Sequence, residues 1–246
     1  MPSVLILGAT STIARATAVE FARHGSDLIL GGRNTEELAA LAADLNLRYA
    51  VATEILEFDA TSFETHEATL QALLTRAGKT LAGVVVCVGY LGDQQVAQRD
   101  PAEARRILDT NFTGCVSALN ILGNYFEEKR SGFLCAVSSV AGDRGRQSNY
   151  LYGSAKAGLT TYLQGLRNRL HPAGVRVITV KPGFVDTRMT YGLPKLFLVT
   201  TPEKVARGIY HAVVRGKDVV YVPGFWRLIM LVIRHIPEAL FKRLEL

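Results

Sequence analysis

The chain has 246 residues, 48% of them hydrophobic and 20% charged, a balance that fits a globular protein with a sizeable core and excludes a disordered or fibrous chain. Its formal net charge of +6 at pH 7 mildly favours anionic ligands, a class that includes dinucleotides, phosphorylated substrates, anionic membrane surfaces and nucleic acid. The three cysteines lie far apart without metal-ligand spacing, so we expect them to be small core residues and expect no metal site.

Apolar stretches near the N-terminus and elsewhere are short. Val4–Leu7 is too short for the apolar region of a signal peptide, and no stretch approaches the ~20 apolar residues that a membrane-spanning helix needs. We therefore expect a cytoplasmic protein.

Short β-like runs alternate with helical patterns along the chain, and the runs are continuously apolar, as parallel strands buried on both faces are. The predicted strands are Val4–Leu7, Asp27–Leu30, Ile55–Phe58, Val84–Val88, Phe133–Val137, Val175–Val180 and Val219–Val222. Helical segments between them include Thr12–His24, Thr35–Leu45, Ala102–Tyr125 and Tyr152–Leu170. This alternation predicts an α/β fold with one Rossmann-type domain over residues 1–224, a doubly wound parallel seven-stranded sheet in a three-layer αβα sandwich.

The first strand leads into a turn of small residues, Gly8–Ala14, and then a helix. Backbone N–H groups and the helix dipole at such a turn favour a pyrophosphate. A plain strand-to-helix turn is the alternative, but the position in the first βα unit of a parallel sheet favours a dinucleotide. The predicted contacts are Gly8, Thr10, Ser11, Thr12 and Ile13.

Arg33 follows the second strand, where NAD-specific folds usually carry an acidic residue. An arginine can pair with the 2′-phosphate of NADP, so NADP(H) is preferred and NAD(H) is the alternative. Arg33 as a solvated surface residue is the competing interpretation. Asp59, after the third strand, is expected either to contact the adenine or to cap a helix.

Tyr152 and Lys156 are four residues apart on a predicted helix and therefore share a face. A free phenol keeps its proton at neutral pH, and a neighbouring ammonium group stabilises the phenolate and so eases proton exchange with a substrate. Ser139, at the end of the fifth strand, is placed to hydrogen-bond a substrate oxygen. Asn111 is expected to hold a water that links Lys156 to solvent. A surface pair with no function is the alternative for Tyr152 and Lys156 taken alone.

Taken together, these motifs resemble those of the short-chain dehydrogenases/reductases. The matching residues are the Gly8–Ala14 loop, Asp59, Asn111 in Asn-Phe-Thr-Gly, Ser139 in Ser-Ser-Val-Ala-Gly, Tyr152-x-x-x-Lys156 and Pro182-Gly183-Phe184-Val185-Asp186-Thr187. The resemblance implies hydride transfer at a nicotinamide, a catalytic set of Asn111, Ser139, Tyr152 and Lys156, and a homodimer or homotetramer. It also implies cofactor contacts from Tyr152, Lys156, Pro182, Gly183, Val185 and Thr187, the last two holding the nicotinamide carboxamide.

The sequence departs from the family pattern at two places. Leu7, Thr12 and Ala14 replace a threonine and two glycines of the usual loop, and Cys87-Val88-Gly89 replaces Asn-Ala-Gly. Gly89 is retained as a cofactor contact, and the proton-transfer residues are untouched. These changes indicate a divergent branch.

Residues 225–246 form an apolar and basic tail, expected to pack on the domain or at a subunit interface. An amphipathic segment at a membrane surface, or a lid over a lipid-linked substrate, is the second interpretation. Together with the Gly8–Ile13 loop and Gly142–Arg146, the tail resembles reductases related to decaprenylphosphoryl-2-keto-ribose reductase, which reduces a keto-sugar on a polyprenyl phosphate.

The leading hypothesis is therefore an NADP-dependent oxidoreductase that reduces a ketone to a secondary alcohol, on a small-molecule or lipid-linked carbonyl substrate. The alternative is a non-catalytic NADP-binding regulator or scaffold. Nucleic-acid binding is not expected, because no basic stripe with interleaved aromatic residues is present.

Overall fold

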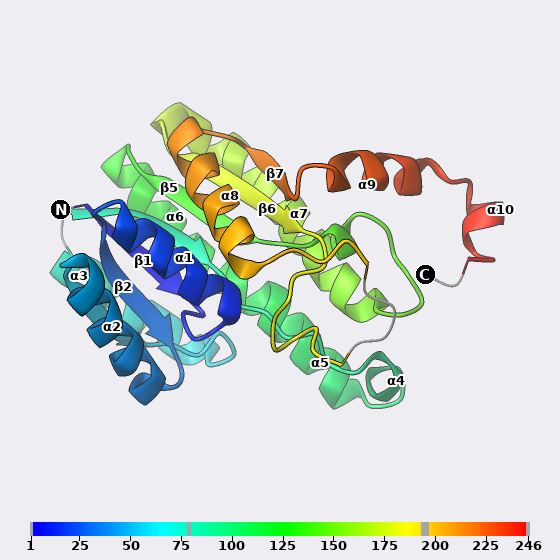
Figure 1. The fold of residues 1–246 in the computed structure, drawn as a ribbon, viewed down its shortest axis with the longest axis horizontal. Helices are drawn as coiled ribbons and strands as arrows, with labels where there is room; N and C mark the ends of the chain where they lie inside the picture. The colour runs from blue at the N-terminus through cyan, green and yellow to red at the C-terminus, as the bar shows by residue number, and fades with distance from the viewer. Residues whose placement is uncertain (1, 78–79, 193–196, 245–246) are drawn as a thin grey trace.

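The computed structural model describes residues 2–77, 80–192 and 197–244, and its centre is a parallel sheet (Figure 1). Seven strands in these residues run in the order β3-β2-β1-β4-β5-β6-β7, all pairs parallel. They are β1 Ser3–Leu7, β2 Asp27–Gly32, β3 Thr53–Glu57, β4 Leu81–Val86, β5 Phe133–Val137, β6 Arg176–Pro182 and β7 Val219–Val222. The predicted doubly wound Rossmann architecture is confirmed. Successive strands are added toward one edge of the sheet from β1 to β3 and toward the other edge from β4 to β7, so the order of the strands switches between β1 and β4.

Helices cover both faces of the sheet. The longer ones are α1 Thr12–Arg23, α2 Thr35–Tyr49, α3 Phe63–Ala77, α6 Gly114–Lys129, α7 Tyr150–Leu170 and α8 Pro202–Arg215. Shorter ones are α4 Gln94–Ala97, α5 Pro101–Leu108, α9 Trp226–His235 and α10 Glu238–Phe241, with single turns η2 Asp109–Thr113, η3 Val140–Gly142 and η4 His171–Ala173. Figure 1 shows α1 and α8 side by side on one face and α6 and α7 on the other.

Alternate side chains of the central strands pack into two separate cores, one on each face of the sheet, which explains why these strands are continuously apolar in sequence. Val4 and Ile6 pack with residues of α1, α2 and α8, whereas Leu5 and Leu7 pack with residues of α3, α6 and α7. All three cysteines are buried within these cores, as the sequence predicts.

The single helix predicted over Ala102–Tyr125 is instead three consecutive segments: α5, the π-helical turn η2 and α6. α5 begins at Pro101 with Asp100 as its N-cap, so the predicted start is one residue late. At the start of α6, a Cβ on Gly114 would lie 2.0 Å from the Ala60 carbonyl oxygen. The helix therefore approaches the segment after β3 more closely than any larger residue permits, and the π turn lies directly before this contact.

The tail contacts the domain through α9. Trp226 and Met230 are buried against Val140 from η3 and against Phe184 from the segment after β6. Leu228, Leu231 and Val232, on the other face of the same helix, are exposed. Within the described segments, no helix combines the length and apolarity required to cross a bilayer.

Candidate active site

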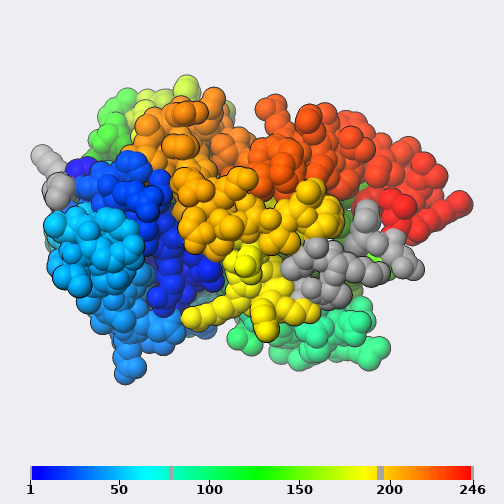
Figure 2. Space-filling model, in the orientation of Figure 1, coloured from blue at the N-terminus to red at the C-terminus, as the bar shows by residue number. Residues whose placement is uncertain are grey.

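A cavity of about 790 Å³ runs along the carboxyl ends of the central strands, where ligands bind in open parallel sheets. Its volume lies within the ~300–1,000 Å³ typical of small-molecule sites. The segment after β6, yellow in Figure 2, lies between the blue N-terminal segment and the green α4–α5 region and supplies part of the cavity wall.

The loop after β1 forms one end of this cavity. Gly8 has a φ of +78°, which a residue with a side chain rarely adopts, and a Cβ there would lie 3.0 Å from the Cys87 carbonyl carbon. Ser11 is the N-cap of α1 and its Oγ accepts a hydrogen bond from the Ala14 N–H. Thr12 and Ile13 begin the helix and line the cavity. The predicted residues Gly8, Thr10, Ser11, Thr12 and Ile13 are thus brought together.

Arg33 and Asp59 line the same end of the cavity. Arg33 is exposed, and no hydrogen bond or ion pair holds its guanidinium among the described residues. Burial opposes ionisation of Asp59, but two hydrogen bonds from Thr61 and the charge of Arg33 leave its pKa lowered on balance. Asp59 closes a turn with Thr61 and does not cap α3, which begins at Phe63.

Ser139, Tyr152 and Lys156 meet in the middle of the cavity wall. Lys156 is 2% exposed, and its Nζ donates to the carbonyl oxygens of Val137, at 3.1 Å, and Val88, at 3.3 Å. The same Nζ lies 5.8 Å from the centre of the Tyr152 ring. The ammonium is therefore held at the ends of β4 and β5 and beside the phenol, as the four-residue spacing predicts.

Two adjacent serines at the end of β5 have different surroundings. Ser138 is buried and its Oγ contacts the Lys156 carbonyl oxygen and the Thr160 hydroxyl, so it fastens β5 to α7. The Ser139 Oγ accepts a hydrogen bond from the Ala141 N–H at 3.0 Å, which leaves its own hydrogen free to donate into the cavity.

Asn111 is placed behind the wall rather than on it. It is fully buried in the π turn, and its Nδ2 donates to the carbonyl oxygens of Tyr90 and Ile107. Gly89 lies between it and Lys156, since a Cβ on Gly89 would be 3.5 Å from the Asn111 Oδ1 and 3.9 Å from the Lys156 Nζ.

The segment after β6 brings Pro182, Gly183, Val185 and Thr187 to the cavity. Thr190, which the sequence did not single out, ties this segment together: its hydroxyl donates to the Val185 carbonyl oxygen and accepts from the Thr187 N–H. A Cβ on Gly183 would lie 1.9 Å from the Trp226 Nε1, so the tail packs directly behind this wall. The connection from this segment to α8 includes residues 193–196, which lie outside the described residues.

Other lining residues carry no motif of their own. Tyr90 stacks under the Arg106 guanidinium, 4.3 Å from its ring centre, and its hydroxyl donates to Glu103. Arg146 and Asn149 precede α7 and face the cavity. The Gly142–Arg146 sequence was part of the narrower resemblance, but nothing in it indicated which arginine reaches the cavity.

Comparison with known proteins agrees with this geometry. The family model of the short chain dehydrogenases matches residues 2–195. The chain is a short-chain dehydrogenase. An uncharacterized oxidoreductase of Mycobacterium tuberculosis is 38% identical over 241 residues, covering 98% of this chain and 96% of that protein. Sulfoacetaldehyde reductase 2 of Chromohalobacter salexigens is 32% identical over 192 residues, 76% of this chain and 74% of that protein.

Among solved structures, a short-chain dehydrogenase from Sphingobium yanoikuyae in complex with NADPH superposes with a TM-score of 0.82. It is 26% identical, and the match covers 97% of each chain. This dehydrogenase is therefore an oxidoreductase with the family's single-domain fold.

Proposed function

We propose that this dehydrogenase uses NADPH to reduce a ketone to a secondary alcohol, with Tyr152 as the proton donor. The observation that carries the proposal is that Ser139, Tyr152 and Lys156 line one cavity, with the Lys156 ammonium fixed by two backbone carbonyls beside the Tyr152 ring. NAD(H) is the alternative cofactor.

The cavity end near α1 fits a dinucleotide phosphate. The N–H groups of Thr12 and Ile13 point out of the first turn of α1, and none of the described residues supplies an acceptor for them. Unpaired N–H groups at the positive end of a helix suit a pyrophosphate. Thr10 and Ser11 complete this site.

Arg33 and Asp59 favour a phosphorylated adenosine. Arg33 stands exposed at the end of β2 and forms no ion pair among the described residues, and the nearby Asp59 carboxylate is engaged by Thr61. The NADPH bound to the Sphingobium yanoikuyae relative supports the same preference. At the other end, Pro182, Gly183, Val185 and Thr187 are assigned to the nicotinamide, with Gly89 beside it.

The residues of this chain perform the proton transfer. NADPH, when bound, supplies the hydride that reaches the carbonyl carbon. The Tyr152 phenol donates its proton to the carbonyl oxygen, and the Lys156 ammonium stabilises the phenolate that remains. The Ser139 hydroxyl, with its hydrogen free, donates to the same oxygen while negative charge develops on it.

For Asn111 we propose a positioning role. Its hydrogen bonds fix the Tyr90 backbone, and so hold Gly89 and the Val88 carbonyl oxygen that accepts from Lys156. The water that the sequence assigns to Asn111 stays a prediction.

For the substrate we carry forward a narrower hypothesis, a keto-sugar on a lipid carrier, as in the reductases related to decaprenylphosphoryl-2-keto-ribose reductase. Exposed Leu228, Leu231 and Val232 on α9 support it, because they offer an apolar surface on the helix whose Trp226 packs against Phe184 of the cavity wall. The same surface suits the interface of a homodimer or homotetramer. Light scattering and co-sedimentation with anionic liposomes separate the two uses.

The test is the variant Tyr152→Phe, which removes only the phenolic oxygen. We expect turnover of a ketone panel with NADPH to fall by about 10²–10⁴-fold, the usual contribution of a general acid. Tyr150→Phe is the matched control, since Tyr150 lies two residues earlier on α7, exposed and outside the cavity.

Full activity of Tyr152→Phe would refute the proton-donor role. Binding of NADPH without turnover of any carbonyl compound would favour the alternative, a regulator or scaffold.

A further inference from the structure

Arg146 lies in the wall of the cavity with no partner for its guanidinium. Among the described residues it makes no side-chain hydrogen bond and no ion pair, and its Nε is buried without an acceptor. Burial lowers the pKa of Arg146, although an arginine stays charged at neutral pH. An unpaired charge in a half-buried position costs free energy unless an anion joins it.

Two neighbours of Arg146 in the loop before α7 are held by contacts of their own. Asp143 forms a buried ion pair with Lys181 and accepts a hydrogen bond from the Tyr221 hydroxyl at 2.8 Å. Arg144 points the other way, toward the tail. It binds Glu238 at 2.6 Å and the Arg234 carbonyl oxygen at 3.1 Å, and its guanidinium carbon lies 4.1 Å from the centre of the Phe241 ring.

Most other cationic side chains around the cavity have partners, and Arg33 and Arg188, which have none among the described residues, are exposed. Arg105 pairs with Asp109 at 3.2 Å, Arg106 lies over the Tyr90 ring, and Lys156 is bound by backbone carbonyls. Arg146 differs from Arg33 and Arg188 because it is half-buried, and its Nε has no acceptor among the described residues.

Asn149 adds a second polar group at the same place. It occupies the N-cap position of α7, where an asparagine normally accepts from the first turn of the helix, yet its side chain caps nothing. Its Oδ1 is buried without a partner, and the residue lines the cavity. The Oδ1 is an acceptor, so it calls for a donor such as a hydroxyl on the same ligand, beside the group that Arg146 binds.

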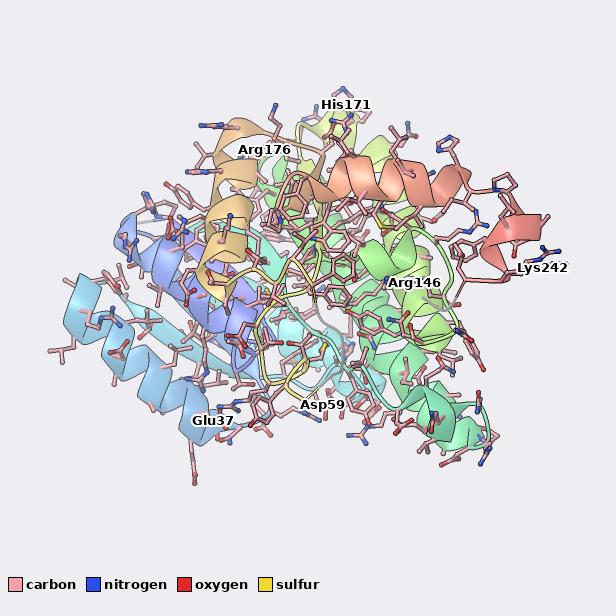
Figure 3. All side chains as sticks on the ribbon, turned by 45° about the vertical axis from the view of Figure 1, so that its right-hand side comes forward. Glu37, Asp59, Arg146, His171, Arg176 and Lys242 are labelled. Atoms are coloured by element: carbon pink, nitrogen blue, oxygen red, sulfur yellow. The ribbon has the colours of Figure 1, made fainter. Side chains whose placement is uncertain are left out.

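We propose that the substrate carries an acidic group, a carboxylate, sulfonate or phosphate, which Arg146 binds, while the Asn149 Oδ1 accepts from a donor elsewhere on the same ligand. Arg146 belongs to the loop between Ser139 and Tyr152, so the acidic group would lie on the substrate side of the reacting carbonyl. Figure 3 shows Arg146 beneath α9, apart from Asp59 at the adenine end. This assignment rests on the proposed function and deepens it, because it makes Arg146 a specificity-determining residue.

The experiment compares carbonyl compounds that differ by one charged group. The pairs are 4-oxopentanoate with its methyl ester, 2-oxopropane-1-sulfonate with acetone, and dihydroxyacetone phosphate with dihydroxyacetone. We expect the wild-type protein to prefer the acidic member of at least one pair. The preferred pair shows whether the acidic group of the substrate is a carboxylate, a sulfonate or a phosphate. In Arg146→Gln, kcat/KM for that acid should fall by about 10- to 100-fold, the range for a charge-assisted hydrogen bond, with its neutral partner changed by less than about threefold.

Arg207→Gln is the matched control, because Arg207 is exposed on α8 and away from the cavity. The KM for NADPH should be unchanged in Arg146→Gln. A rise in that KM with no change in acid preference would overturn the proposal and assign Arg146 to the cofactor. A wild-type preference for the neutral member of every pair would overturn it as well.

A binding arm separates this proposal from the proposed function. Thermal unfolding of the NADPH-free protein is measured with the acid and with its neutral partner at equal concentration. Stabilisation by the acid that disappears in Arg146→Gln supports the site even if no compound is reduced, an outcome that would count only against the reductase. Equal shifts in wild type and Arg146→Gln, or no shift from any acid, would refute the site.

Discussion

Asn111 and Tyr90 hold each other by two hydrogen bonds: the Asn111 Nδ2 donates to the Tyr90 carbonyl oxygen at 2.6 Å, and the Tyr90 N–H donates to the Asn111 Oδ1 at 3.1 Å. A third bond, from the Asn111 Nδ2 to the Ile107 carbonyl oxygen, ties the same side chain to the end of α5. One fully buried amide thus links the helix to the cavity wall next to Lys156.

Asn111→Ala should reduce the free energy of unfolding by on the order of 2–3 kcal/mol, because it leaves buried backbone groups of Tyr90 and Ile107 without partners. Urea denaturation measures the loss. The control is Asn168→Ala, an exposed asparagine on α7, with an expected change of less than about 0.5 kcal/mol. Equal stability of the two variants, with turnover lost only in Asn111→Ala, would mean that Asn111 acts in proton transfer alone.

Arg33→Ala should raise the KM for NADPH by about 10- to 100-fold and leave the KM for NADH within about twofold. The reason is that a guanidinium–phosphate pair is lost only with the phosphorylated cofactor. Steady-state kinetics with both cofactors measure this, and Arg99→Ala, another exposed arginine, is the control. A protein that binds NADH more tightly than NADPH, and is indifferent to Arg33→Ala, would contradict the phosphate role.

The three thiols should be unreactive in the native protein. Burial raises the pKa of Cys87 to about 12, and it also raises the pKa values of Cys115 and Cys135. Because the thiolate is the nucleophile, iodoacetamide at pH 8 should modify no cysteine of the folded protein and all three in guanidinium chloride, as mass spectrometry would show. Rapid modification of Cys87 in the native state would show that the cavity wall opens.

These raised pKa values also predict how stability depends on pH. The thiols ionise near pH ~8.5 in the unfolded chain but stay protonated in the folded one. The stability of the folded protein is therefore unaffected by these thiols below that pH. Above it, ionisation of the thiols favours the unfolded chain, so the free energy of unfolding falls progressively as the pH rises toward 12. Thermal unfolding between pH 8 and 11 should therefore show a declining midpoint, and the decline should be shallower in Cys87→Ala.

Trp226→Ala should cost about 3–5 kcal/mol of stability, since the indole is 1% exposed and packs against Gly183, Phe184 and Met230. Leu228→Ala, on the exposed face of the same helix, should cost less than about 0.5 kcal/mol. Denaturant unfolding separates the two outcomes. Similar small losses in both would mean that α9 is not part of the folded unit.

The sequence determined the order of strands and helices, because continuous apolar runs and helical periodicity depend on local spacing. It also placed Gly8, Arg33 and Ser139 after predicted parallel strands, and Tyr152 and Lys156 on one face of a predicted helix. The structure places these residues along one cavity.

Contacts between segments far apart in the chain were decided only by the tertiary structure. Asn111 lies behind the wall because Gly114 packs against Ala60 beside the π turn, and no local pattern encodes that approach. Arg144 and Arg146 are two residues apart and chemically alike, yet one binds the tail through Glu238 and the other lines the cavity. The partner of a charged side chain depends on which distant segment the fold brings to it, and the local spacing of residues does not predict that segment.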